Sequence, residues 1–158
     1  MVRIYIVSHG FEYIERSYRA AAGRARMLRP ALNLVADDMI QDTKMQFESG
    51  GRRGGGSWKF PTQETRKRKA RRGQDPRTLF GTHRLFDSLT ARGDEDMILE
   101  ISNTGIHYGS RVRYADTHQH GDASRGIPAR PFIQFLDSDI DRWGDIILSY
   151  ITDPMRRG

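Results

Sequence analysis

The sequence predicts an α+β fold in which a small, mainly antiparallel sheet is flanked by an N-terminal helix pair and a C-terminal helix. Three observations predict it. Apolar residues recur every three or four positions over 11–28 and 30–47, which is the spacing of a helix face. Residues 96–112 alternate around an Asn-Thr-Gly turn, as in a β-hairpin. Residues 137–151 carry an apolar stripe at helical spacing. With 158 residues, we expect a single domain over 1–158.

The N-terminal part begins with a predicted strand over 2–8, where β-branched residues alternate with others. The first helix, 11–28, is followed by Pro30. Proline suits the first turn of the second helix, because its missing N–H is not needed there. The second helix should end near Phe47, since Ser-Gly-Gly follows.

Little regular structure is expected over 49–83. Gly-Gly-Arg-Arg-Gly-Gly-Gly-Ser at its start is flexible, and the dense positive charge that follows repels itself. We interpret the segment as a long Gly/Arg-rich projecting arm, with Trp58 and Phe60 as anchors and a short helix at 62–72. We expect the arm to be mobile in the isolated protein and ordered on assembly.

The C-terminal half contains five predicted elements. A short helix over 82–92 precedes two strands, 96–102 and 106–112, and a short strand is predicted over 132–135. The last helix, 137–151, can be capped by a serine or aspartate in its first residues. Its apolar stripe consists of Ile140, Trp143, Ile147, Leu148 and Ile151. Of these, Trp143, Ile147 and Ile151 are interpreted as core, with packing between subunits as the alternative.

Composition restricts the class of protein. The chain has no Cys, which excludes disulfides and thiolate metal sites and suits assembly in a reducing cytoplasm. No apolar run approaches the length of a membrane span, and residues 1–7 lack the apolar core of a signal peptide. We therefore expect no membrane contact. Only 37% of residues are hydrophobic, which suggests that part of the chain packs against something else, such as copies of itself.

The charge is positive and unevenly distributed. The formal net charge of +6 favours an acidic partner, either nucleic acid or an acidic protein surface. Residues 66–72 hold six cations in seven positions, whereas residues 137–145 hold four Asp and one Arg. Head-to-tail contact between identical subunits would bring these oppositely charged segments together.

The most distinctive motifs are Tyr-Ala-Asp-Thr-His-Gln-His-Gly at 114–121 and Ile-Pro-Ala-Arg-Pro-Phe at 127–132. Pro128 and Pro131 hold the two residues between them out of the helical region, so Arg130 belongs to a rigid, extended segment. We predict that Arg130 makes a charge-assisted contact with a carboxylate or with carbonyl groups, within the subunit or across to the next. No nucleophile and base accompany the motifs, so we interpret them as a docking element.

The histidines of the first motif admit a second interpretation. His118 and His120, with His107 nearby, could suggest a metal site, because a strand places residues i and i+2 on one face. A third ligand is unassigned and no Cys is present, so we expect no metal. The favoured interpretation is that His118 and Gln119 hydrogen-bond the loop that presents the two prolines. No cofactor is expected either, because the glycines of 50–56 lack the Lys-Ser/Thr ending of a phosphate-binding loop.

These motifs, followed by an acidic amphipathic tail, resemble the virion morphogenesis or tail completion family of tailed bacteriophages. The similarity extends over roughly residues 30–150. Upstream features fall in the order of the family pattern: Phe47, a Gly-rich turn, Trp58, Pro61, Thr62, the basic run, and then Leu79, Gly81, Leu85, Ser88 and Leu89.

The resemblance implies a non-enzymatic structural protein of the virion. Such proteins complete the tail or join head to tail at the neck, as a ring of about six copies around the DNA channel. The implied partners are other copies of itself, the head connector or stopper, the tail terminator or tail tube, and the phage DNA in the channel. Assembly would occur in the cytoplasm of the bacterial host. A tail terminator that caps the tube is the alternative in the same class.

The basic run leaves three interpretations open: a solvated face, contact with a neighbouring subunit or partner ring, and contact with nucleic acid. Binding to phosphates would depend steeply on salt. No helix-turn-helix, zinc finger or base-stacking platform accompanies the run, so we favour protein contact. The rival from another class is a basic, non-specific nucleic-acid-binding accessory protein. The residues predicted at subunit or partner interfaces are Trp58, Arg66, Lys67, Arg68, Lys69, Arg71, Arg72, Tyr114, His118, Gln119, Pro128, Arg130, Pro131 and Phe132.

Overall fold

A computed structural model describes residues 11–156, so the strand predicted over 2–8 lies outside the described residues. The predicted α+β class is confirmed, with a single two-stranded antiparallel sheet among the described residues. The elements are α1 (Phe11–Ala25), α2 (Arg29–Glu48), η1 (Arg52–Gly54), α3 (Gln63–Arg71), α4 (Arg84–Thr90), β1 (Met97–Ile101), β2 (Ile106–Ser110), α5 (Ala115–His120), η2 (Ala123–Arg125) and α6 (Asp137–Arg156).

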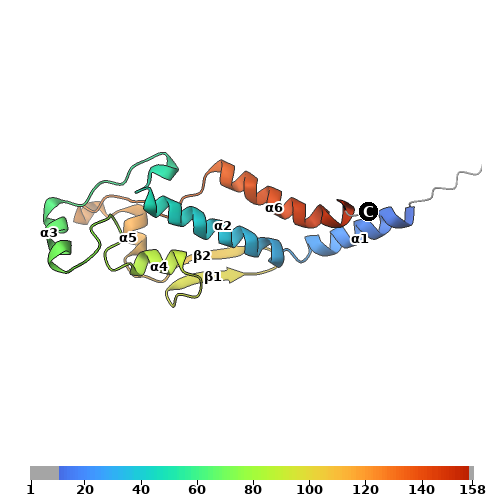
Figure 1. Ribbon diagram of the computed structural model, residues 1–158, viewed down its shortest axis with the longest axis horizontal. Helices are drawn as coiled ribbons and strands as arrows, with labels where there is room; N and C mark the ends of the chain where they lie inside the picture. The colour runs from blue at the N-terminus through green and yellow to red at the C-terminus, as the bar shows by residue number, and fades with distance from the viewer. Residues whose placement is uncertain (1–10, 157–158) are drawn as a thin grey trace, which may run out of the picture.

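The molecule is elongated and layered around α2. In Figure 1, α2 lies between α6 on one side and the hairpin with α4 on the other. Helix α3 occupies one end of the molecule, and α1 packs along the C-terminal part of α6 at the opposite end. The α1–α6 contact includes a hydrogen bond from the Arg24 guanidinium to the Tyr150 carbonyl at 2.9 Å.

The predicted hairpin is confirmed. Ile101 pairs with Ile106 beside the turn, and Met97 pairs with Ser110 at the other end. The hydroxyl of Ser102 accepts hydrogen bonds from the backbone N–H groups of two turn residues. The Tyr108 hydroxyl donates to the Leu89 carbonyl at 2.6 Å, which attaches the hairpin to α4.

The core lies at the C-terminal end of α2 and is rich in aromatic rings. The ring of Phe47, which is 1% exposed, contacts four other aromatic rings at centroid distances of 5.5–5.9 Å. Edge-to-face ring contacts of this kind stabilise a core beyond the area that they bury. The buried cluster consists of Phe47, Trp58, Phe80, Leu85, Leu89, Val112, Ala115 and Phe132.

The prediction of a projecting arm over 49–83 is wrong for the first part of that range. Trp58 is only 6% exposed and belongs to the core, and its backbone N–H donates to the Gly50 carbonyl at 2.8 Å. Gly51 has φ +89° and lies so close to the indole that a side chain there would collide with the ring. The glycines therefore allow tight packing here rather than flexibility. The predicted anchor Trp58 is confirmed, whereas Phe60 is 78% exposed and anchors nothing within the chain.

The short helix predicted at 62–72 is confirmed as α3. Thr62 caps it, because its hydroxyl accepts a hydrogen bond from the Thr65 backbone N–H at 3.2 Å. The helix has no buried residue.

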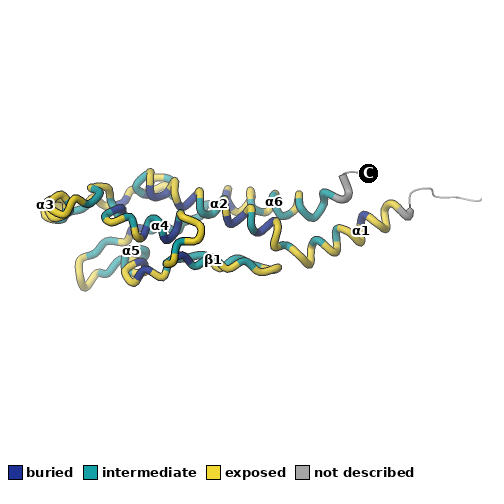
Figure 2. The backbone as a smooth tube through the Cα atoms, turned by 60° about the horizontal axis from the view of Figure 1, so that its bottom comes forward, coloured by how far each residue is buried: buried dark blue, intermediate teal, exposed yellow. Residues whose placement is uncertain are grey.

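The strand predicted over 132–135 is wrong, and α5 was not predicted. The backbone N–H groups of Phe132 and Ile133 donate to the side chain of Gln119, so they are not available to pair with a strand. The interpretation of Trp143, Ile147 and Ile151 as core is borne out only in part. Trp143, Ile147 and Ile151 are half-buried, and two further members of the stripe are exposed. In Figure 2 the buried residues gather around α2, α4 and α5, while α1 and α6 are largely intermediate or exposed.

No helix in the described range 11–156 is long and apolar enough to cross a membrane.

The loop between α3 and α4 closes on Asp75, whose carboxylate accepts hydrogen bonds from the Arg77 guanidinium, the shortest at 2.6 Å. These bonds lower the pKa of Asp75 to about 2. Because the pKa is lower in the folded state, the stabilisation is complete above the ordinary value near 4 and is lost as pH falls towards 2. In denaturant unfolding between pH 2 and 6, Asp75→Asn should destabilise the protein at pH 6 and have little effect at pH 2. An equal effect at both pH values would contradict this assignment.

Candidate subunit and partner interface

The Pro-Ala-Arg-Pro-Phe segment is held from one side by α5. The side-chain carbonyl of Gln119 accepts hydrogen bonds from the backbone N–H groups of Phe132, at 3.0 Å, and Ile133, at 3.2 Å. Its amide nitrogen donates to the Ile133 carbonyl at 2.9 Å. The backbone N–H of Arg130 donates to the His118 carbonyl at 2.7 Å. The prediction that His118 and Gln119 hydrogen-bond this loop is confirmed, although His118 does so through its backbone.

The opposite side of the segment is held by α2 and the loop that follows it. The Pro131 carbonyl accepts hydrogen bonds from the side-chain amide of Gln46, at 2.9 Å, and the indole N–H of Trp58, at 3.2 Å. Phe132 is 2% exposed and lies in the core. Four of the predicted interface residues thus lie together and hold the Pro-Ala-Arg-Pro-Phe segment in place: Trp58, Gln119, Pro131 and Phe132.

Arg130 is turned inward rather than outward. Its guanidinium donates to the Lys59 carbonyl from Nε at 3.2 Å and from a terminal nitrogen at 3.1 Å. Burial lowers the pKa of this guanidinium. The predicted contact with carbonyl groups is confirmed within the subunit. Because Lys59 lies three residues before the N-cap of α3, Arg130 holds the segment from which the basic helix extends.

The other predicted residues of the motif lie nearer the surface. Tyr114 is 42% exposed, and its ring contacts the half-buried imidazole of His118 edge-to-face, with ring centroids 5.8 Å apart. Burial and the nearby Arg130 lower the pKa of His118, so the imidazole is neutral at pH 7. Pro128 lines an open cavity of about 410 Å³ together with Lys59 and the loop between α5 and Pro128.

Helix α3 presents its cations to solvent, with one exception. Arg66, Lys67, Arg68, Arg71 and Arg72 are exposed and form no ion pair with any other residue in the described part of the chain. Lys69 instead donates to the carbonyls of Asp75, at 3.0 Å, and Arg77, at 2.6 Å. Lys69 therefore fastens the end of α3, and the remaining cations are available to a partner.

A buried ionic cluster that sequence reasoning missed joins α2, η1 and α6. A terminal nitrogen of Arg53 lies 2.7 Å from a carboxylate oxygen of Asp42 and 2.6 Å from one of Asp139. Both carboxylates belong to residues that are 1% exposed. Arg142 reaches the same two carboxylates and also that of Asp38, at 2.7, 3.1 and 2.6 Å respectively. The available signal was the spacing of Asp38 and Asp42, which places two carboxylates on one face of α2.

The two buried carboxylates differ in their titration. Burial raises the pKa of Asp42 despite the nearby Arg53. Burial acts in the same direction on Asp139, but hydrogen bonds from Arg53 and from the Leu136 backbone N–H outweigh it and lower the pKa of Asp139. Asp139 is thus the more firmly ionised partner, and Arg53 is the cation that links the Gly-rich loop to α6.

The Gly-rich loop is further held through Gly54. Its backbone N–H donates to the Gln46 side chain at 3.1 Å, and its carbonyl accepts from the Gln134 side chain at 3.2 Å. A side chain at Gly54 would collide with Gln134. Close packing therefore accounts for glycine at position 51, beside Trp58, and favours it at position 54, beside Gln134.

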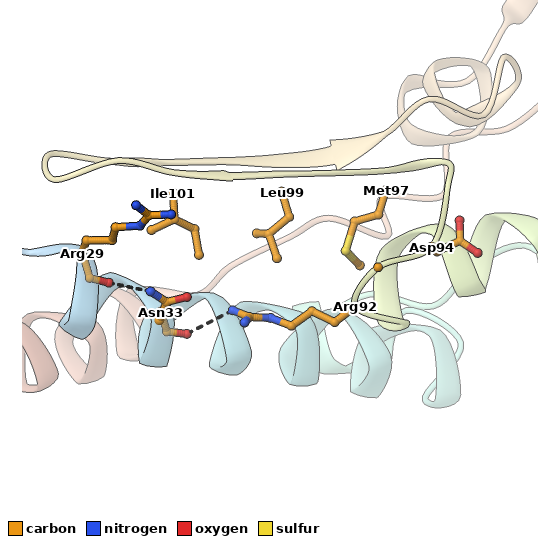
Figure 3. A pocket seen from close by; sticks show the side chains of 8 residues that line it. Arg29, Asn33, Arg92, Asp94, Met97, Leu99 and Ile101 are labelled. Carbon is orange, nitrogen blue, oxygen red and sulfur yellow. Dashed lines mark hydrogen bonds between the residues drawn. The ribbon is translucent and has the colours of Figure 1, made fainter.

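A second hollow is a groove between α2 and the hairpin. It has a volume of about 330 Å³, and its lining includes Met97, Leu99 and Ile101 of β1. Figure 3 shows these three side chains pointing towards α2, with Arg29 and Arg92 at its edges. Among residues 11–156, no group of three or more His, Cys, Asp or Glu side chains could hold a metal ion. The groove is apolar on one wall and charged at its rim, and it holds no arrangement of a nucleophile with a base.

The sequence of this chain matches a known protein family. Residues 11–152 match the model of the phage virion morphogenesis family. The chain belongs to this family. Membership indicates a structural or assembly role in a phage and association with the virion, and families of this kind are typically not enzymatic. No significant match to a curated protein or to a solved structure was found.

Within this virion morphogenesis protein, the Gln119 clamp can be tested directly. Gln119→Ala should lower the free energy of unfolding by about 1–3 kcal/mol, because it leaves the backbone N–H groups of Phe132 and Ile133 without acceptors. The matched control is His120→Ala, since the neighbouring His120 is exposed and pairs only with Asp116 one helical turn away. Urea unfolding of both variants measures the difference. Equal stability of the two variants would show that the clamp is dispensable.

Proposed function

We propose that this protein completes the tail or joins head to tail, forming a ring at the neck around the DNA channel between the head connector and the tail tube. The observation that carries the proposal is the set of large apolar side chains left exposed on α1 and α6. Tyr13, Ile14 and Tyr18 of α1 are 40%, 51% and 65% exposed. Exposed apolar side chains gathered on a helix pair mark a protein interaction site.

Family membership supports a location in the virion for that interaction. Identical subunits that contact one another head-to-tail form a closed ring when the rotation between them closes. A ring of about six copies suits a tail tube, and the resemblance noted from the motifs implies that number. In this proposal, the ring faces bind the head connector or stopper above and the tail terminator or tube below, and the ring assembles in the bacterial cytoplasm.

This proposal has two alternatives. A tail terminator would use the same self-associating surfaces to cap the tube. A basic nucleic-acid-binding accessory protein is favoured by the five unpaired cations of α3 and its C-cap residue, Arg72. The neck ring is preferred because α1 and α6 expose apolar groups, which phosphate binding would leave uncovered.

Self-association can be measured by native mass spectrometry of the purified protein and by imaging of particles. We expect a closed ring of about six copies. Tyr18→Asp should weaken the ring, because it places a charge within the exposed apolar surface of α1. Arg19→Asp is the comparison, since Arg19 is exposed on the same helix and pairs with Glu15 instead of belonging to the apolar surface. Only monomers in solution and in particles would show that the ring is wrong.

A further inference from the structure

The outer face of α6 has no partner within the chain. Six residues at spacings of three and one occupy one side of the helix: Asp137, Ile140, Asp141, Gly144, Asp145 and Leu148. All six are exposed, with Ile140 and Leu148 at 57% and 56%. None of the three carboxylates forms an ion pair with another residue of the described range. The buried Asp139 lies on the opposite side of the helix, so the outer face is separate from the buried ionic cluster.

Helix α3 has the complementary surface. Lys67 and Arg71 lie one turn apart on the side away from Lys69, which is fastened to the loop. Phe60, just before the helix, is 78% exposed. The face of α3 thus combines unpaired cations with one large apolar side chain. The face of α6 combines unpaired carboxylates with two large apolar side chains, Ile140 and Leu148.

The lengths of the two surfaces also agree. The nine helical residues of α3 and the nine residues from Asp137 to Asp145 each span about 12 Å, at a rise of about 1.5 Å per residue. The pair Lys67 and Arg71 and the pair Asp141 and Asp145 each have four-residue spacing, so both pairs can meet at once. Gly144, which has no neighbouring atom within 4 Å of an added side chain, leaves room for a bulky group from a partner.

The two faces cannot meet within one chain. Helix α3 lies at one end of the elongated molecule, and α6 runs from its middle towards the other end (Figure 1). A contact between them must therefore join different copies, and it is head-to-tail, because the two surfaces are different.

We propose that α3 of one copy docks on the outer face of α6 in the next copy, with its cations against Asp137, Asp141 and Asp145. With Lys67 at Asp145 and Arg71 at Asp141, Phe60 lies about two turns beyond Lys67 and packs against Leu148. The inference rests on the self-association of the proposed function and assigns one pair of its contact surfaces. Arg130, by holding the Lys59 carbonyl, orients the base of the docking helix. The occupant is a second copy rather than nucleic acid, because the carboxylates and apolar groups that complement α3 are present on the same chain.

The test is a charge exchange between the two faces. Lys67→Glu/Arg71→Glu and, separately, Asp141→Lys/Asp145→Lys should each weaken ring formation by about tenfold or more, because attraction becomes repulsion at two sites. The variant that carries all four changes should recover ring formation, since the charges are again complementary. Asp137 is left unchanged, because an acidic residue in the first turn stabilises α6.

Arg26→Glu/Arg113→Glu is the matched control for the change on α3. Both residues are exposed, and the net charge changes equally. Circular dichroism verifies that every variant is folded, and sedimentation in low and high salt measures assembly. Full ring formation by both two-residue variants, or failure of the four-residue variant to recover, would overturn the docking surfaces while leaving the ring intact. A wild-type protein that forms no ring would overturn the proposed function as well. Loss of duplex DNA binding by Lys67→Glu/Arg71→Glu, with rings unchanged, would assign α3 to nucleic acid instead.

Discussion

Arg53→Met should lower the free energy of unfolding by about 3 kcal/mol, because it leaves two buried carboxylates without the cation that they share. Removal of one partner from a buried ionic cluster typically costs about 3–5 kcal/mol. The lower end of this range applies to Arg53→Met, since Arg142 still contacts both Asp42 and Asp139. Such a loss is a large fraction of the stability of an ordinary domain. Thermal and denaturant unfolding at pH 7 would measure it.

Arg52→Met is the matched control for this prediction. Arg52 precedes Arg53 in the same short helix, but it is exposed, so its replacement should change stability by no more than about 0.5 kcal/mol. A comparable loss in the two variants would mean that the buried cluster does not stabilise the fold. Since Arg53 also joins the Gly-rich loop to α6, its replacement should allow proteases to cut residues 49–58 of the folded protein more readily.

The second large effect is expected at Trp58. Trp58→Ala should destabilise the protein by about 3–5 kcal/mol, because it opens a cavity beside Phe47 and removes the hydrogen bond to the Pro131 carbonyl. Phe60→Ala is the control: it removes an aromatic ring two residues away that is 78% exposed. It should leave monomer stability nearly unchanged and, on the docking proposal, weaken assembly. Equal destabilisation by the two changes, measured by denaturant unfolding, would contradict the placement of Trp58 in the core.

Together these variants separate folding from assembly. Arg53 and Trp58 contribute to the fold of each subunit, whereas Lys67, Asp141 and Phe60 lie on exposed surfaces that the docking proposal pairs with another copy. Replacement of Arg53 or Trp58 should lower the free energy of unfolding of the subunit, whether or not copies still assemble. A variant of Lys67, Asp141 or Phe60 should retain monomer stability and fail only when copies are brought together.

The sequence by itself determined the features that depend on neighbouring residues. Helical spacing of apolar residues predicted α2, α4 and α6, and alternation around a turn predicted the hairpin. The two prolines and the adjacent His-Gln pair predicted a rigid loop held by hydrogen bonds, and the Gln119 clamp bears this out. These predictions succeed because periodicity and backbone restriction act over a few residues.

Only the tertiary structure decided which side chains are buried. Gly-rich sequence around Arg53 indicated a flexible arm, yet the absence of side chains there allows the backbone to pack against Trp58 and Gln134. The apolar stripe of α6 indicated core, yet the residue that α6 buries most fully is Asp139, which is matched by Arg53 from a distant segment. Burial depends on contacts between segments far apart in the chain, and a charged residue can be buried wherever an opposite charge meets it. No local pattern records where that partner lies.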